Sequence, residues 1–285
     1  MNTLVIIGAS NVTLSLPVIW AGLAGSASPR QRLLVAAGHG RSFALPNTVM
    51  GRMLPSILEC GLWDALAEIS SDEVADRRKP SGLGGLNGDG PDGLRRSATL
   101  STSFDCQQPQ ALITDVGNDI LYGASVEQIA DWVRECVARL QSLGVQTRLT
   151  HLPLDSLRSL SRRRFLFFRK LLFPASTLSY EDAMSAAAEL DAALVELSDA
   201  SGLERTEPQR HWYGLDPIHI RRRARPEAWQ QFLAPLIEGF DPRHPGPLVQ
   251  QRIWTRKAAF RWRGGREFVT PQPCLTAGST ELWLF

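Results

Sequence analysis

Three short apolar runs in this chain each end in a segment that contains glycine and polar residues. They are residues 4–7, 33–37 and 111–115, followed by Gly-Ala-Ser-Asn, Gly-His-Gly-Arg and Val-Gly-Asn-Asp. A short apolar run bounded by glycine is typical of a buried strand rather than of a helix. The sequence therefore predicts a core of buried strands whose ends carry polar groups.

Helical patterns separate these strands along the chain. The predicted helices lie near residues 14–25, 45–58, 126–143, 180–200 and 227–237, and further strands are predicted near residues 146–152 and 203–206. Gly144 is placed to end one helix and Pro226 to begin another. Alternating strands and helices indicate an α/β fold, here a flavodoxin-like three-layer sandwich with a mostly parallel sheet.

Two segments interrupt that alternation. Residues 71–108 include a polar, glycine-rich stretch, and we expect them to form a flexible surface insertion in a domain that covers residues 1–240. Residues 241–285 contain apolar and arginine residues in alternation, at 253–256 and 260–263, with Gly-Gly at 264–265. This pattern predicts a β-hairpin extension packed on the domain, although alternating arginines and aromatics would also suit single-stranded nucleic acid.

Composition limits the classes of protein to which this chain can belong. It has 285 residues, 44% of them hydrophobic and 21% charged, and a net charge of +2, which favours no nucleic-acid partner. The four cysteines form no Cys-x-x-Cys pair, so they indicate neither a zinc knuckle nor a disulfide framework. We expect no metal and no cofactor. The apolar N-terminus lacks a basic leader, and no apolar stretch reaches about 20 residues, so we expect a cytoplasmic protein.

Ser10 is the first candidate for chemistry. It follows a predicted strand at the point where a helix begins, and ligands of α/β sheets bind at that edge. A serine there can act as a nucleophile whose own backbone N–H helps to bind an oxyanion. The alternative is that Ser10 only caps the helix, a role in which serine is common.

Asp216 and His219 form the second candidate group. Their separation by three residues lets the carboxylate reach the imidazole Nδ1 and leaves Nε2 free to accept the Ser10 proton. The other histidines (His39, His151, His211 and His244) are competing candidates, and His151, which ends a predicted strand, has no carboxylate three residues before it. We expect His211 to be a packed or hydrogen-bonded loop residue.

Two further residues offer donors to an oxyanion. Gly40, favoured over Gly38, offers a backbone N–H, and Asn118 offers its side-chain amide. The Gly-Asn-Asp sequence at residues 117–119 is also typical of a turn. We expect Asp119 to be structural and to bind nearby backbone N–H groups.

The order Ser, Gly, Asn and His resembles the SGNH/GDSL family of serine esterases and lipases. Ser10 matches the family's nucleophile, within Gly-Ala-Ser-Asn rather than Gly-Asp-Ser-Leu, and Gly40 matches the glycine of the second block. Asn118 matches the third block, where Val116 replaces the usual glycine, and residues 216–219 match Asp-x-x-His. The resemblance implies metal-free hydrolysis of a small-molecule acyl ester or thioester through an acyl-serine intermediate.

The segment from Arg162 to Phe173 combines basic and large apolar residues. It can form a lid, a contact with a membrane or lipid surface, or a plain packed helix. Two other functions stay open for the chain. One is a catalytically weak scaffold that binds a partner or a membrane. The other is a nucleotide-binding oxidoreductase, but this sequence departs from the glycine fingerprint of such enzymes after Gly8.

Overall fold

A computed structural model describes residues 1–25, 30–45, 47–49, 52–78 and 108–285. Its main sheet has seven strands in the order β10-β11-β2-β1-β5-β6-β7. Five consecutive strands of this order form its parallel α/β core: β2 (Gln31–Ala36), β1 (Asn2–Ile7), β5 (Gln110–Ile113), β6 (Gln146–Thr150) and β7 (Glu204–Thr206). Along the chain these are the second, first, third, fourth and fifth strands, which is the flavodoxin-like order. The predicted fold class is confirmed.

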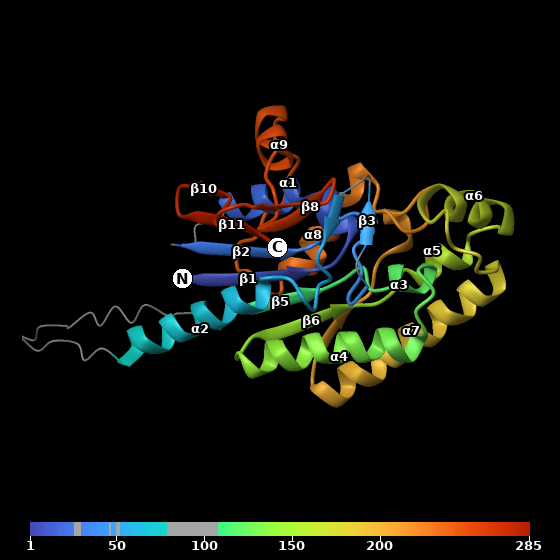
Figure 1. The fold of residues 1–285 in the computed structure, drawn as a ribbon, viewed down its shortest axis with the longest axis horizontal. Helices are drawn as coiled ribbons and strands as arrows, with labels where there is room; N and C mark the ends of the chain where they lie inside the picture. Colours follow the sequence, from blue (N-terminus) through green and yellow to red (C-terminus); the bar gives the residue numbers. More distant parts are fainter. Residues whose placement is uncertain (26–29, 46, 50–51, 79–107) are drawn as a thin grey trace, which may run out of the picture.

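Helices cover both faces of this sheet, so the domain has three layers (Figure 1). One face carries α1 (Ser10–Ala24), α8 (Arg225–Leu233) and α9 (Pro247–Trp254), and the other carries α2 (Leu62–Arg78), α4 (Val126–Ser142) and α7 (Tyr180–Ser201). Successive residues of β1 alternate between the two cores. Leu4 and Ile6 pack on the α1 side, whereas Val5 and Ile7 pack on the α2 side.

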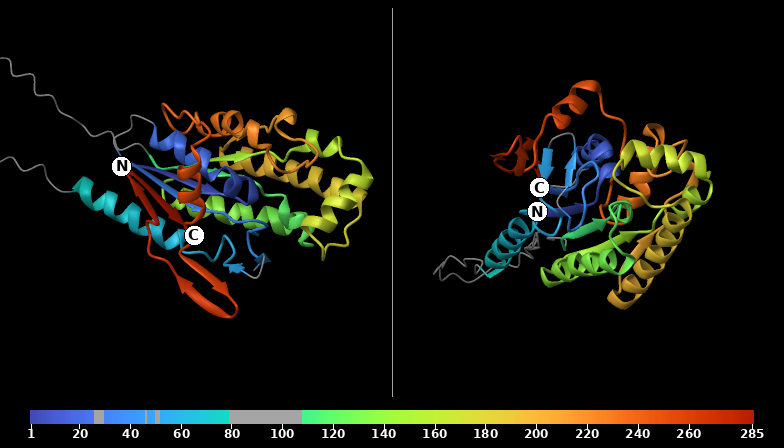
Figure 2. Two further views of the ribbon diagram at one scale, coloured as in Figure 1. Left: turned by 90° about the horizontal axis from the view of Figure 1, so that it is seen from above. Right: turned by 45° about the vertical axis from the view of Figure 1, so that its right-hand side comes forward.

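The short elements gather at the edge where the parallel strands end (Figures 1 and 2). They are α3 (Asn118–Leu121), α5 (Leu154–Arg158), α6 (Arg162–Leu172) and two 3-10 helices, Arg210–Trp212 and Arg222–Ala224. None of the helices in the described part of the chain is long and apolar enough to cross a membrane.

The helix predicted near residues 45–58 is wrong. The chain forms two short antiparallel strands there, β3 (Asn47–Val49) and β4 (Arg52–Leu54). Proline at positions 46 and 55 and glycine at 51 all disfavour a helix across this stretch. The helix lies later, in α2, where Leu62, Leu66 and Ile69 are buried at helical spacing. Because α2 continues to Arg78, residues 71–78 of the predicted insertion are helical, and residues 79–107 lie outside the described residues.

The chain after residue 240 forms more than a hairpin. The predicted hairpin is present as β8 (Phe260–Arg263) and β9 (Arg266–Val269), which pair around two glycines with positive φ and extend the β3-β4 sheet. Residues 253–254, predicted as strand, instead end α9, which begins at a proline. Two further strands, β10 (Leu275–Ala277) and β11 (Thr280–Leu284), join the main sheet through the parallel pairing of β11 with β2.

Candidate active site

The turn between β1 and α1 brings Ser10 to the edge of the sheet. A Cβ atom on Gly8 would lie 2.7 Å from Val12 Cγ2 and 2.9 Å from Thr114 Cγ2, so only glycine fits this close approach. Ser10 is the first residue of α1, and its backbone N–H therefore has no partner within the helix. The turn presents the Ser10 hydroxyl and a backbone donor side by side.

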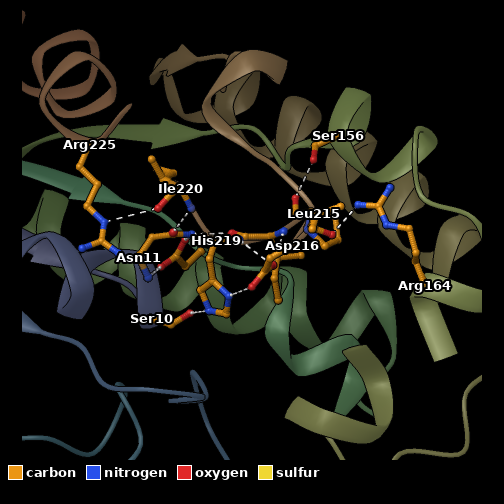
Figure 3. A network of polar contacts seen from close by, with 12 residues as sticks. Ser10, Asn11, Ser156, Arg164, Leu215, Asp216, His219, Ile220 and Arg225 are labelled. Atoms are coloured by element: carbon orange, nitrogen blue, oxygen red, sulfur yellow. Dashed lines mark hydrogen bonds and ion pairs between the residues drawn. The ribbon is translucent and has the colours of Figure 1, made fainter. Parts of the chain in front are cut away.

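The structure brings Ser10, His219 and Asp216 into one chain of hydrogen bonds (Figure 3). His219 Nε2 lies 2.8 Å from Ser10 Oγ, and His219 Nδ1 lies 2.6 Å from Asp216 Oδ2. The carboxylate requires a proton on Nδ1, which leaves the Nε2 lone pair facing the hydroxyl. The imidazole is thus oriented to accept the Ser10 proton.

Asp216 is held as an anion by its own loop. Its Oδ1 accepts the backbone N–H groups of Ile218 (3.0 Å) and His219 (3.1 Å). Burial alone would raise the pKa of Asp216, but the His219 hydrogen bond, the His219 charge and these two N–H groups outweigh burial. The pKa of Asp216 therefore lies below its ordinary value. A carboxylate ionised in this way can stabilise a protonated imidazole.

Asn11 joins the nucleophile turn to the histidine loop. Its Nδ2 donates to the carbonyl of Ile218 and to Asp115 Oδ1, both at 2.8 Å, and its Oδ1 accepts the N–H of Ile220 at 2.8 Å. Asn11 therefore holds the backbone on both sides of His219 (Figure 3). The polar residue directly after Ser10 was the available signal for this role, and the sequence analysis did not use it.

Asp115 is a second residue that the sequence analysis missed. Its Oδ2 accepts the N–H groups of Asn11 (2.8 Å) and Ala9 (3.3 Å), so a carboxylate from the end of β5 caps the N-terminus of α1. Its φ of 59° is left-handed, a conformation that aspartate tolerates better than most residues. Burial raises the pKa of Asp115 above its ordinary value despite these hydrogen bonds. This carboxylate fixes the backbone on both sides of Ser10.

Replacing Asn11 with alanine should lower kcat by about 100-fold and change KM little. The loop around His219 would lose the two anchors that Asn11 supplies, to Ile218 and Ile220, and a small misplacement of a catalytic group is costly. Unpaired backbone groups should also lower the free energy of unfolding by about 1–3 kcal/mol. Ester hydrolysis and thermal unfolding measure the two effects. Unchanged kcat in a folded Asn11→Ala protein would show that Asn11 does not position His219.

The two remaining predicted residues, Gly40 and Asn118, lie on segments that contact each other. The Tyr122 hydroxyl, at the end of α3, donates to the Gly40 carbonyl at 2.7 Å, and Gly40 has a φ of 62°. The Phe43 N–H donates to Asp119 Oδ2 at 3.1 Å, so Asp119 binds a backbone N–H as expected.

The loop that contains His39 and Gly40 also lies near His219. Burial first, and then repulsion from the His219 charge, lower the pKa of His39. Asn118 lines the same cavity as Ser10, and within the described residues no hydrogen bond to its amide is recorded. The roles of Gly40 and Asn118 as oxyanion donors remain predictions.

The burial of Asp119 gives a testable dependence of stability on pH. Burial raises its pKa from 3.8 to about 6, so the unfolded chain ionises at lower pH than the folded one. The free energy of unfolding should therefore fall as pH rises from 4 to 6, by about 2 kcal/mol. Urea titrations at pH 4 and pH 7 should show a smaller difference in Asp119→Asn than in wild type. Asp155→Asn, which removes an exposed carboxylate, is the control. If the free energy of unfolding changed equally between the two pH values in all three proteins, burial of Asp119 would not be the cause of the pH dependence.

His211 and His151 each bind a carboxylate. His211 Nε2 lies 2.6 Å from Glu227, and the ring packs edge-on against Trp212. The expected hydrogen bonding and packing are confirmed, although His211 lies in a 3-10 helix rather than in a loop. His151 Nδ1 lies 3.2 Å from both oxygens of Asp191, and His151 lines the Ser10 cavity. Asp191 lies 40 residues away along the chain, on α7, so no local spacing could have revealed this pair.

The cavity beside Ser10 is mostly apolar. Its polar and charged lining residues are Ser10, Asn11, Thr114, Asp115, Asn118, Thr150, His151, Arg169 and Tyr213. The helices α5, α6 and α7 and the segments next to them contribute the apolar part: Leu157, Leu160, Phe165, Phe168, Leu172, Phe173, Ala183, Met184 and Ala187. An apolar group can therefore be buried next to the hydroxyl of Ser10.

No family model matches this chain, and no curated protein matches its sequence. Several solved structures do match it. This chain is similar to solved esterases. The esterase EstA from Pseudoalteromonas sp. has a TM-score of 0.40 at 12% identity, with 81% of this chain and 94% of that chain covered. The acetyl xylan esterase AlAXEase has a TM-score of 0.43 at 9% identity, with 82% of this chain and 100% of that chain covered. TesA has a TM-score of 0.43 at 14% identity, with 82% of this chain and 99% of that chain covered.

Proposed function

We propose that this chain is a serine hydrolase of the SGNH/GDSL type that cleaves an ester or thioester bond. The observation that carries this proposal is the unbroken series of hydrogen bonds from Asp216 through His219 to Ser10. A half-buried imidazole, oriented by a carboxylate and placed against a serine hydroxyl at the end of a strand, is an arrangement suited to nucleophilic catalysis.

The proposed reaction begins when His219 Nε2 takes the Ser10 proton as Oγ attacks the acyl carbonyl. The backbone N–H groups of Ser10 and Gly40 and the Asn118 amide stabilise the oxyanion, and one such donor typically contributes about 3–4 kcal/mol. The protonated His219 then gives its proton to the departing alcohol or thiol, which leaves an acyl-serine. A water molecule, activated by the same imidazole, attacks the acyl group and releases the acid and the free Ser10 hydroxyl.

The apolar cavity supports an apolar acyl group in the substrate. Its walls offer mainly aromatic and aliphatic contacts, and Arg169 is the one charged residue that α6 adds to them. Each buried methylene contributes up to about 0.8 kcal/mol, so an acyl group that enters this cavity should gain in transition-state binding. We therefore place the acid half of the ester, rather than the alcohol half, in this cavity.

Hydrolysis of a series of p-nitrophenyl esters tests this function. We expect kcat/KM to rise at least tenfold from the acetate to the octanoate, because the longer acyl group buries more methylenes. Met184→Trp should reduce the octanoate value about tenfold and leave the acetate value near wild type, because Met184 lines the cavity.

Met53→Trp is the matched control for that experiment, since Met53 lies on β4 and not on the cavity wall. No hydrolysis of any ester or thioester would contradict the proposed function. Hydrolysis with no preference for chain length, or equal effects of the two tryptophan variants, would contradict only the placement of the acyl group.

A further inference from the structure

The helix α6 has one face toward the cavity and one toward solvent. Phe165 is buried, and Phe168 and Leu172 line the cavity. On the opposite side, Phe167 and Leu171 each expose 63% of their surface. These two residues are four apart and therefore lie on the same face of the helix. Large apolar side chains exposed in this way on a short helix need an explanation other than core packing.

Unpaired positive charge accompanies those apolar residues. The helix contains five arginine or lysine residues and no acidic residue. Arg162 lies 3.5 Å from Glu181 in an ion pair, and Arg164 and Arg169 donate to backbone carbonyls. Arg163 and Lys170 are exposed, and neither has an ion-pair partner within the ranges that the structure describes. Helical spacing places both on the side that carries Phe167 and Leu171.

We propose that the outer face of α6 (Arg163, Phe167, Lys170 and Leu171) binds a membrane surface that contains anionic lipid. Cations attract anionic headgroups, and the aromatic and leucine side chains between them can enter the boundary of the acyl chains. A nucleic acid would use the cations but would leave Phe167 and Leu171 without an apolar contact. The helix lies on the outside of the molecule, at the edge where the strands end (Figures 1 and 2).

Such binding would bring the proposed active site close to the lipid. Arg164 donates to the carbonyls of Gly214, at 3.2 Å, and Leu215, in the loop that carries Asp216 and His219 (Figure 3). Leu215 is 79% exposed, which adds an apolar side chain next to α6. This consequence rests on the proposed function, whereas the membrane binding itself does not.

Vesicle sedimentation of the full chain tests the binding without any turnover. We expect binding to vesicles of phosphatidylcholine with phosphatidylglycerol, weaker binding to phosphatidylcholine alone, and loss of affinity at high salt. Phe167→Ser with Leu171→Ser should weaken binding about tenfold or more. Arg163→Gln with Lys170→Gln should weaken it roughly fivefold for each cation removed. Hydrolysis of p-nitrophenyl acetate should be unchanged in both variants, because none of these residues lines the cavity.

A second exposed apolar pair provides the control. Leu248 and Val249 on α9 are 82% and 40% exposed, and Leu248→Ser with Val249→Ser should bind vesicles like wild type. The proposal would be overturned by absence of binding to anionic vesicles or by loss of binding only in the α9 variant. It would also be overturned if wild type were a dimer that the Phe167 and Leu171 substitutions dissociate, since α6 would then bind a second copy. Ser10→Ala should bind vesicles normally, which separates this result from any failure of hydrolysis.

Discussion

Ser10→Ala should lower kcat/KM for p-nitrophenyl octanoate by about 10⁴-fold or more. The substitution removes the proposed attacking oxygen, and the proposed oxyanion donors and the apolar cavity would account for the residual rate. Stability should change little, because within the residues that the structure describes the hydroxyl of Ser10 makes one hydrogen bond, to His219. Steady-state hydrolysis measures the loss, and circular dichroism with thermal unfolding shows that the variant is folded.

Ser15→Ala is the matched control for this experiment. Ser15 lies in the same helix, is fully buried, and its hydroxyl has no hydrogen-bond partner within the described residues. We expect wild-type kcat/KM from it. A folded Ser10→Ala protein that cleaves the ester at the wild-type rate would exclude Ser10 as the nucleophile.

Asp216→Asn should lower kcat by about 10⁴-fold with the loop intact. The new amide oxygen can still accept the N–H groups of Ile218 and His219, so the backbone keeps its anchor. The amide NH₂ would face His219 Nδ1 and favour a proton on Nε2, which is the tautomer that cannot accept the Ser10 proton. The measurement is kcat for the octanoate at neutral pH.

Asp191→Asn makes the same chemical change at the second histidine–carboxylate pair. We expect a loss below tenfold, because His219 rather than His151 contacts Ser10. A loss in Asp191→Asn as large as in Asp216→Asn would assign the base to His151 and contradict the proposed roles.

The sequence predicted the parallel sheet well because its strands are marked locally. Buried strands in an α/β fold are short, continuous apolar runs, and glycine or polar residues mark their ends. Residues 45–58 were wrongly predicted as a helix because they also contain spaced apolar residues, although the prolines at 46 and 55 and the glycine at 51 disfavour one. The strand that pairs with this stretch lies far along the chain. Arg52 and Met53 on β4 pair with residues 262–263 on β8, and no local pattern reports a partner at that distance.

The residues of the candidate site that lie in short local motifs were also predictable from the sequence. Asp216 and His219 lie in one short motif, and Ser10 lies at the end of a recognisable strand. The contacts of Asn11 with Asp115 and with Ile218 join segments more than 100 residues apart. Such contacts depend on how the ends of β1 and β5 meet, so the structure is needed to find them.

Covalent labelling with a fluorophosphonate probe tests the central claim most directly, because the probe needs an activated serine and no knowledge of the substrate. We expect one probe molecule per chain, mapped by peptide mass spectrometry to Ser10, and much slower labelling of Asp216→Asn. An unlabelled wild-type protein, or a label on a different serine, would contradict the account.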